Sequence, residues 1–96
     1  MDYRARLRAA IHDRYAMTCT HIRSETVPCV EGRDVVVEVF SCVGEDEGRL
    51  AYAWERSSAD HRGESDIVIV LGGPRIRGAR DAVAAAEEEA ELERHA

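Results

Sequence analysis

The chain has 96 residues, of which 45% are hydrophobic and 33% charged, and its formal net charge is −6. This length allows one domain with a single modest core, and the composition is that of a globular protein, neither collagen-like nor disordered. No unbroken apolar run is longer than the five residues from Ile67 to Leu71, far shorter than the about 20 residues that a membrane-spanning helix needs. We therefore expect one domain over residues 1–96 that is not inserted in a membrane.

Acidic residues outnumber basic ones mainly in the C-terminal two-thirds of the chain, where residues 35–96 hold seven Arg and fourteen acids. This balance disfavours a nucleic-acid binder, because such proteins gain affinity mainly by neutralising phosphates. The three cysteines are odd in number and lack the spacing of a disulfide framework. No apolar stretch of the signal-peptide type follows the N-terminal Arg residues, so we expect a cytoplasmic protein with reduced thiols.

A first helix is predicted over residues 2–16, and a last helix from near Gly78 towards Arg94. Both have apolar positions three and four residues apart, which is the spacing of one helix face. Alanine occupies most of these positions in the last helix, so its apolar face is narrow and allows close approach to a sheet. The apolar positions are Tyr3, Leu7, Ala10, Ile11 and Tyr15 in the first helix, and Ile76, Ala79, Val83, Ala86 and Ala90 in the last.

Four strands are predicted between the helices. The first spans residues 18–30, where Thr, Ile and Val dominate, and Pro28 marks it as an edge strand or a bulged one. The second, from Asp34 to Cys42, has apolar residues on both faces, which indicates a central strand. The third, residues 50–54, alternates large side chains with alanine, so one face is bulky and the other flat. The fourth, residues 66–71, is a short apolar run that ends at two glycines. Turns at 31–33 and 44–48 and a polar loop at 57–65 join the strands.

The order α-β-β-β-β-α with short connections favours an antiparallel meander in an α+β fold. We expect a two-layer sandwich, in which about four antiparallel strands carry the N- and C-terminal helices on one face. Such a sheet leaves its other face bare, although the second strand is apolar on both faces. Burial of the bare face against a second copy resolves this conflict, so we expect a homodimer.

Three sequence blocks follow one another in the strands: Val37-Glu38-Val39-Phe40, Ala51-Tyr52-Ala53-Trp54 and Val68-Ile69-Val70-Leu71, with Pro74 and Ala82-Val83 downstream. With these blocks, roughly residues 18–86 resemble a widespread group of small uncharacterised bacterial proteins, some of which travel on mobile gene cassettes such as those of integrons. Here Glu55-Arg56 follows the second block, where the group often has Ser-His. The resemblance implies a compact natural domain and supplies no particular activity.

The most reactive residue types lie at Cys19-Thr20-His21, which places a thiol and an imidazole on one strand face, with Cys29 at the same parity. This pattern fits a metal half-site or a Cys/His pair, but no second closely spaced pair of ligands accompanies it. His61 has carboxylates nearby and could serve acid-base chemistry, whereas a solvated polar loop explains the same residues. We therefore assign no catalytic residue, no metal and no cofactor.

Candidate ligand- or partner-binding residues are large or cationic side chains of the strands and of the turn after the fourth strand. Tyr52 and Trp54 share a strand face, and they either lie in the core under the helices or form an exposed binding surface. Arg75 and Arg77 belong to a turn whose free backbone N–H groups could hold a phosphate or carboxylate, unless it is a plain turn. Phe40 completes the set.

Three functions remain open. The first, which we favour, is a small non-enzymatic, homodimeric accessory protein that binds a protein partner or a small apolar ligand. The second is a small enzyme with an aromatic pocket near Tyr52 and Trp54 and with Cys19, His21 or His61 as the reactive group. The third is an acidic, antitoxin-like antagonist of a basic partner, because the last helix is rich in Glu.

Overall fold

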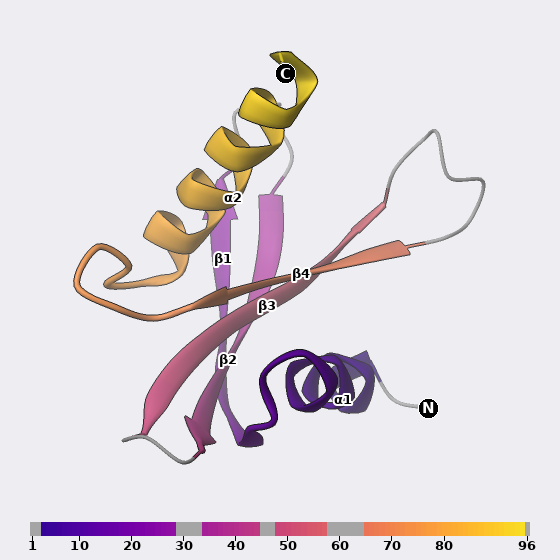
Figure 1. Cartoon of the computed structure of the whole chain (residues 1–96), viewed down its shortest axis with the longest axis vertical. Coiled ribbons are helices and arrows are strands. Elements are labelled where there is room, and N and C mark those ends of the chain that lie inside the picture. Colours follow the sequence, from indigo (N-terminus) through magenta and orange to yellow (C-terminus); the bar gives the residue numbers. More distant parts are fainter. Residues whose placement is uncertain (1–2, 29–33, 45–47, 58–64, 96) are drawn as a thin grey trace.

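The computed structural model describes residues 3–28, 34–44, 48–57 and 65–95. The four strands form one antiparallel sheet in the order β1-β2-β3-β4, and Figure 1 shows the two hairpins diverging towards their tips. No helix among the described residues is long and apolar enough to cross a membrane. The elements are α1 (Tyr3–Tyr15), β1 (Thr18–Pro28), β2 (Asp34–Val43), β3 (Arg49–Ser57), β4 (Ser65–Leu71) and α2 (Ala79–His95).

The predicted α+β class, the order α-β-β-β-β-α and the antiparallel meander are confirmed. β2 lies between two other strands, as its two apolar faces predict, and β1 is an edge strand, as Pro28 predicts. Several predicted features fall outside the described residues: the turn at 31–33, most of the turn at 44–48, the loop at 58–64, Cys29 and His61.

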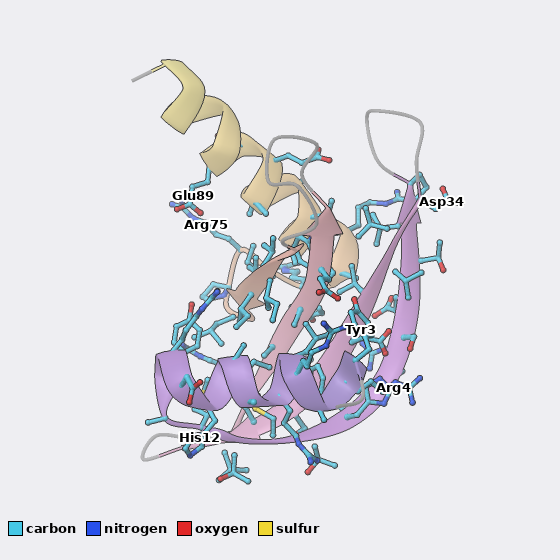
Figure 2. The ribbon with its side chains drawn as sticks, turned by 90° about the vertical axis from the view of Figure 1, so that its right-hand side faces the viewer. Tyr3, Arg4, His12, Asp34, Arg75 and Glu89 are labelled. Atoms are coloured by element: carbon cyan, nitrogen blue, oxygen red, sulfur yellow. The ribbon has the colours of Figure 1, made fainter. Side chains whose placement is uncertain are left out.

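The two helices cover opposite faces of the sheet, so the predicted two-layer arrangement with both helices on one face is wrong. Successive strand residues point to opposite faces, and the sheet therefore separates two cores. We call them the α1-side core and the α2-side core, after the helix that covers each; Figure 2 shows α1 in front of the strands. The first contains Leu7, Ile11, Cys19, Phe40, Cys42, Ala51, Ala53 and Ile69, and the second contains Val27, Val37, Val39, Tyr52, Trp54, Ala79, Ala82 and Val83.

The shape of β3 accounts for this distribution of the helices. To the α1-side core β3 contributes only Ala51 and Ala53, which leave room for the larger Leu7 and Ile11 of α1. On the other side it offers Tyr52 and Trp54, which pack with the small residues of α2. Each layer thus joins a flat surface to a bulky one, as close packing requires.

β1 contains a β-bulge at Ile22. His21 lies opposite Phe40 and Arg23 lies opposite Val39, so Ile22 is the extra residue between them. Directly opposed residues share a face of the sheet, and the bulge therefore exchanges the faces of all the β1 residues that follow it.

Beyond the bulge, each side chain of β1 points to the face opposite to the one that an unbroken strand would give it. Ser24 lies opposite Glu38 on the α1 side, although its even number would place it on the α2 side in an unbroken strand. Val27 joins the α2-side core for the same reason. The parity that we predicted from Cys19 along β1 therefore holds only as far as His21.

α1 ends in a turn that uses a left-handed residue. Ala16 has φ 54° and donates its N–H to the carbonyl of His12 at 2.8 Å. Tyr15, the last residue of α1, is an exposed side chain, so the predicted apolar stripe of this helix ends at Ile11.

Adjacent valines of β2 test the two-core arrangement. Val37 is fully buried and Val36 is 48% exposed. We expect Val37→Ala to lower the free energy of unfolding by about 2 kcal/mol, because it leaves a cavity in the α2-side core. Val36→Ala should change it by less than about 0.5 kcal/mol. Urea titration followed by the fluorescence of Trp54 measures both, and equal effects would contradict the assignment of the faces.

Candidate functional site

The α1-side core encloses a carboxylate. Glu38 of β2 is 3% exposed, and its Oε1 accepts three hydrogen bonds. The donors are Ser24 Oγ at 2.6 Å, His21 Nε2 at 2.8 Å and Arg4 Nε at 3.2 Å. His21 and Ser24 are three residues apart in one strand, and the β-bulge between them puts both on the face of Glu38.

These contacts determine the charge of Glu38. Burial alone would raise the pKa of Glu38, but the hydrogen bonds from Ser24, His21 and Arg4 outweigh it, and the pKa lies below the ordinary value of 4.5. Glu38 is therefore a buried anion at neutral pH, with the Arg4 guanidinium as its countercharge. Ser24 donates to Glu38 directly, so His21 does not stand between hydroxyl and carboxylate as it does in a Ser-His-acid triad.

A second carboxylate lies where β3 parts from β2. The pairing of these strands ends at Glu38 and Ala53. Beyond it, the N–H of Glu55 donates to the Tyr3 hydroxyl at 3.1 Å, and Arg6 Nη2 lies 3.2 Å from Glu55 Oε2. The side chains of α1 thus satisfy a backbone donor that the diverging strand has left without a partner.

The first turn of α1 explains why the two carboxylates are needed. It contains no acidic residue, and Arg4 and Arg6 place positive charge at the helix end where the macrodipole disfavours it. Glu38 and Glu55 contact these two guanidinium groups and offset that charge. Together the four residues attach the N-terminal end of α1 to β2 and β3.

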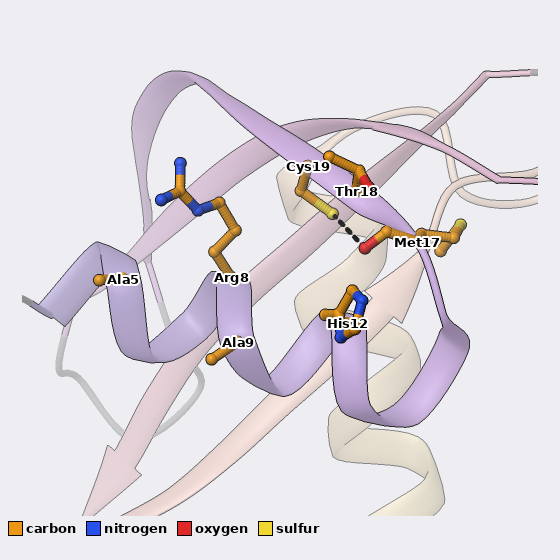
Figure 3. A pocket seen from close by; sticks show the side chains of 7 residues that line it. All are labelled: Ala5, Arg8, Ala9, His12, Met17, Thr18 and Cys19. Carbon is orange, nitrogen blue, oxygen red and sulfur yellow. Dashed lines mark hydrogen bonds between the residues drawn. The ribbon is translucent and has the colours of Figure 1, made fainter.

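A pocket of about 430 Å³ runs along α1 from its first turn to His12, between the helix and the start of β1 (Figure 3). Figure 2 shows Tyr3 and Arg4 at one end of α1 and His12 at the other. The volume is in the range of small-molecule sites, and the wall is mainly apolar, with the Arg8 guanidinium and the His12 imidazole beside it. The lining residues are Ala5, Arg8, Ala9, His12, Met17, Thr18 and Cys19.

The predicted binding residues are not brought together. Tyr52 and Trp54 are buried in the α2-side core, the first of the two placements that the sequence left open. Phe40 is buried in the α1-side core on the opposite face, with its ring 5.4 Å from that of His21. The binding role assigned to these residues stays a prediction.

Arg75 and Arg77 lie in the exposed connection between β4 and α2. The backbone N–H of Arg77 donates to Asp81 Oδ2 at 3.0 Å. A carboxylate of this chain therefore already occupies one of the backbone donors that the predicted anion site would use.

The components of the predicted enzyme are also apart. Cys19 belongs to the α1-side core, and His21 bonds to Glu38 on that same face, whereas Tyr52 and Trp54 face α2. The sheet thus separates the thiol and the imidazole from the aromatic pair. Within the described ranges, no three His, Cys, Asp or Glu side chains gather as a metal ion would require.

Glu38 and its donors Arg4 and Ser24 were not among the predicted site residues. The available signal is a single Glu in the run of valines and Phe from residue 35 to residue 40. A charge inside a central strand requires hydrogen-bonding partners, which no spacing rule identifies before the register is known.

Comparison of this chain with known protein families, curated proteins and solved structures gives no match. The function is therefore inferred from the geometry of the chain itself.

The carboxylate of Glu38 makes stability depend on pH. We expect Glu38→Gln to lower the free energy of unfolding by about 2 kcal/mol at pH 7, because an amide cannot accept the charge-assisted bonds. A lowered folded-state pKa contributes stability above the unfolded value of 4.5 that is lost as the pH falls through the folded value. The difference between wild type and variant should therefore narrow below pH 4.5.

The control for this experiment is Glu25→Gln, since the Glu25 side chain is 38% exposed and its ion pair among the described contacts is with exposed Arg23. It should cost less than about 0.5 kcal/mol in urea titrations at either pH. The same loss and the same pH dependence in both variants would contradict the role of Glu38.

Proposed function

We propose that this chain is a small, non-enzymatic, cytoplasmic accessory protein of the gene-cassette type, which works as a homodimer and binds a protein partner or a small apolar ligand. The bare sheet face that suggested a dimer is covered by α2. The observation that now supports the dimer is the open edge of β4, which is the last strand of the sheet and has no further strand beside it among the described residues.

The hydrogen bond between Glu55 and Tyr3 shows in which direction the backbone N–H and C=O groups of β4 point. The N–H of Glu55 points to the Tyr3 hydroxyl and away from β4. Backbone groups alternate in direction along an antiparallel pair, so Glu55 and its partner Ile67 are not hydrogen-bonded to each other. The N–H and C=O groups of Ile67, and by alternation those of Ile69 and Leu71, therefore point to the open edge.

The occupant that fits this edge is a second copy of the chain. From Ile67 to Leu71 the strand has no charge and no proline, and its pairing with β3 runs without a bulge. A second β4 related by a two-fold axis presents the same donors and acceptors in antiparallel order. The other edge differs, because the bulge at Ile22 and Pro28 in β1 are features that block strand addition.

The pocket between α1 and β1 is the place proposed for a small apolar ligand. Alanines and Met17 form its apolar wall. Arg8 and His12 line it as well and would favour a ligand that carries an acidic group.

Native mass spectrometry of the untagged wild-type protein, purified without chelator, tests the proposal. We expect a dimer at micromolar concentration, because edge pairing joins two matched strands. A monomer at that concentration would contradict the homodimer. A stoichiometric added mass would identify a bound ligand, which the proposal places in the pocket.

A proline in β4 tests the interface. We expect Ile67→Pro to make the protein monomeric, because it removes an N–H that points to the open edge and takes no part in the β3 ladder. Size-exclusion chromatography with light scattering gives the mass, and circular dichroism verifies that the fold is kept. In the matched control, Thr26→Pro removes an outward N–H from exposed Thr26 of β1 and should leave the dimer intact. Dissociation by both variants or by neither would rule out the β4 interface.

A further inference from the structure

Two cysteines face each other across the β1–β2 pair. Cys19 and Cys42 are direct partners in the register, and their Sγ atoms are 2.6 Å apart. Both are free thiols inside the α1-side core, Cys19 with 4% of its surface exposed and Cys42 with none. A disulfide bond is about 2.05 Å long, so closing the pair needs a movement of only about half an ångström.

The strand pairing also favours a bond between them. The N–H of Glu55 points away from β4, so by alternation the N–H and C=O groups of Ala53 point to β2. Its partner Glu38 therefore directs its N–H and C=O groups to β3, and by alternation Cys42 does the same. Cys19 and Cys42 are therefore a non-hydrogen-bonded pair. In such pairs the Cα atoms are about 4.5 Å apart, which lies within the span of about 4.4–6.8 Å that a disulfide bridges.

We propose that Cys19 and Cys42 form a reversible oxidation site, at which hydrogen peroxide converts the two thiols into a disulfide. The Cys19 sulfur attacks one peroxide oxygen, the O–O bond breaks, and the Cys19 proton leaves with the other oxygen as water, which gives a sulfenic acid at Cys19. The Cys42 sulfur then attacks Cys19 Sγ, the S–O bond breaks, and the proton of Cys42 leaves with the oxygen as a second water. Two thiols are oxidised by two electrons, and one peroxide is reduced to two waters.

The pocket indicates which of the two cysteines is oxidised first. Cys19 lines the pocket beside Arg8 and His12, as Figure 3 shows, whereas Cys42 lies behind it in the core. A small oxidant therefore reaches Cys19 first. Burial, and with it the contact to Cys19, raises the pKa of Cys42 to about 12, so Cys42 is a protonated, weakly nucleophilic thiol that does not react with the peroxide itself.

Peptide mapping tests the site in the wild-type protein. Trypsin separates the three cysteines into fragments 15–23, 24–33 and 34–49. Reduced protein is treated with hydrogen peroxide, alkylated and digested without reductant. We expect fragment 15–23 linked to fragment 34–49, an intact mass about 2 Da lower, and recovery of both thiols with dithiothreitol. The closed hairpin should raise Tm by on the order of 10 °C.

Two results would overturn the proposal: a link that involves fragment 24–33, or only sulfinic and sulfonic products at Cys19. The variant Cys29→Ser should form the same link as the wild type. Cys19→Ser and Cys42→Ser should form none and should show no rise in Tm with peroxide. If Cys42→Ser does not fold, the peptide maps of the wild type and of Cys29→Ser still show whether Cys19 and Cys42 are linked.

The route of the oxidant has its own test. We expect Ala9→Phe to fill the pocket and slow disulfide formation severalfold, because Ala9 lines it. Asp13→Phe adds the same side chain to an exposed position of α1 outside the lining and should leave the rate unchanged. An unchanged rate in Ala9→Phe would overturn entry through the pocket.

Discussion

The β-bulge at Ile22 is the constraint on which the α1 side of this fold depends. It turns Ser24 towards Glu38, and so gives the buried carboxylate a second donor from the same strand as His21. A charge that deep in the core requires several partners, because its desolvation is costly. Arg4 supplies the last of them, and its contact with Glu38 attaches the first turn of α1 to the sheet.

The position of each helix follows from the surface that β3 offers. A helix with large apolar residues fits the alanine face, and a helix with small residues fits the face of Tyr52 and Trp54. Exchanging the helices would set bulky residues against bulky ones on one side and leave voids on the other. β2 is buried on both faces because a helix packs against each side of the sheet.

The helices, the strands and the central place of β2 could be predicted because they follow from local periodicity and from the apolar content of single segments. The layer of each helix could not, since it depends on matching two segments far apart in the chain. The contacts of the site were harder still to predict from the sequence. Glu38 interacts with Arg4 and Ser24 only after the bulge has shifted the register, and Cys19 opposes Cys42 only once the hairpin has formed. Counting alternate residues from Cys19 gives the wrong face beyond Ile22, because the bulge shifts the register there.

The two ends of the sheet are unequal, and this limits how far strand pairing can extend. A sheet with two open edges can add copies without end, which is how fibres grow. Here β4 is open, whereas β1 is bulged at Ile22 and carries Pro28. Two chains joined through β4 would present only β1 edges to the solvent, so assembly stops at a closed pair. In such a pair, the bulge that arranges the core of one chain would also keep a population of chains from polymerising.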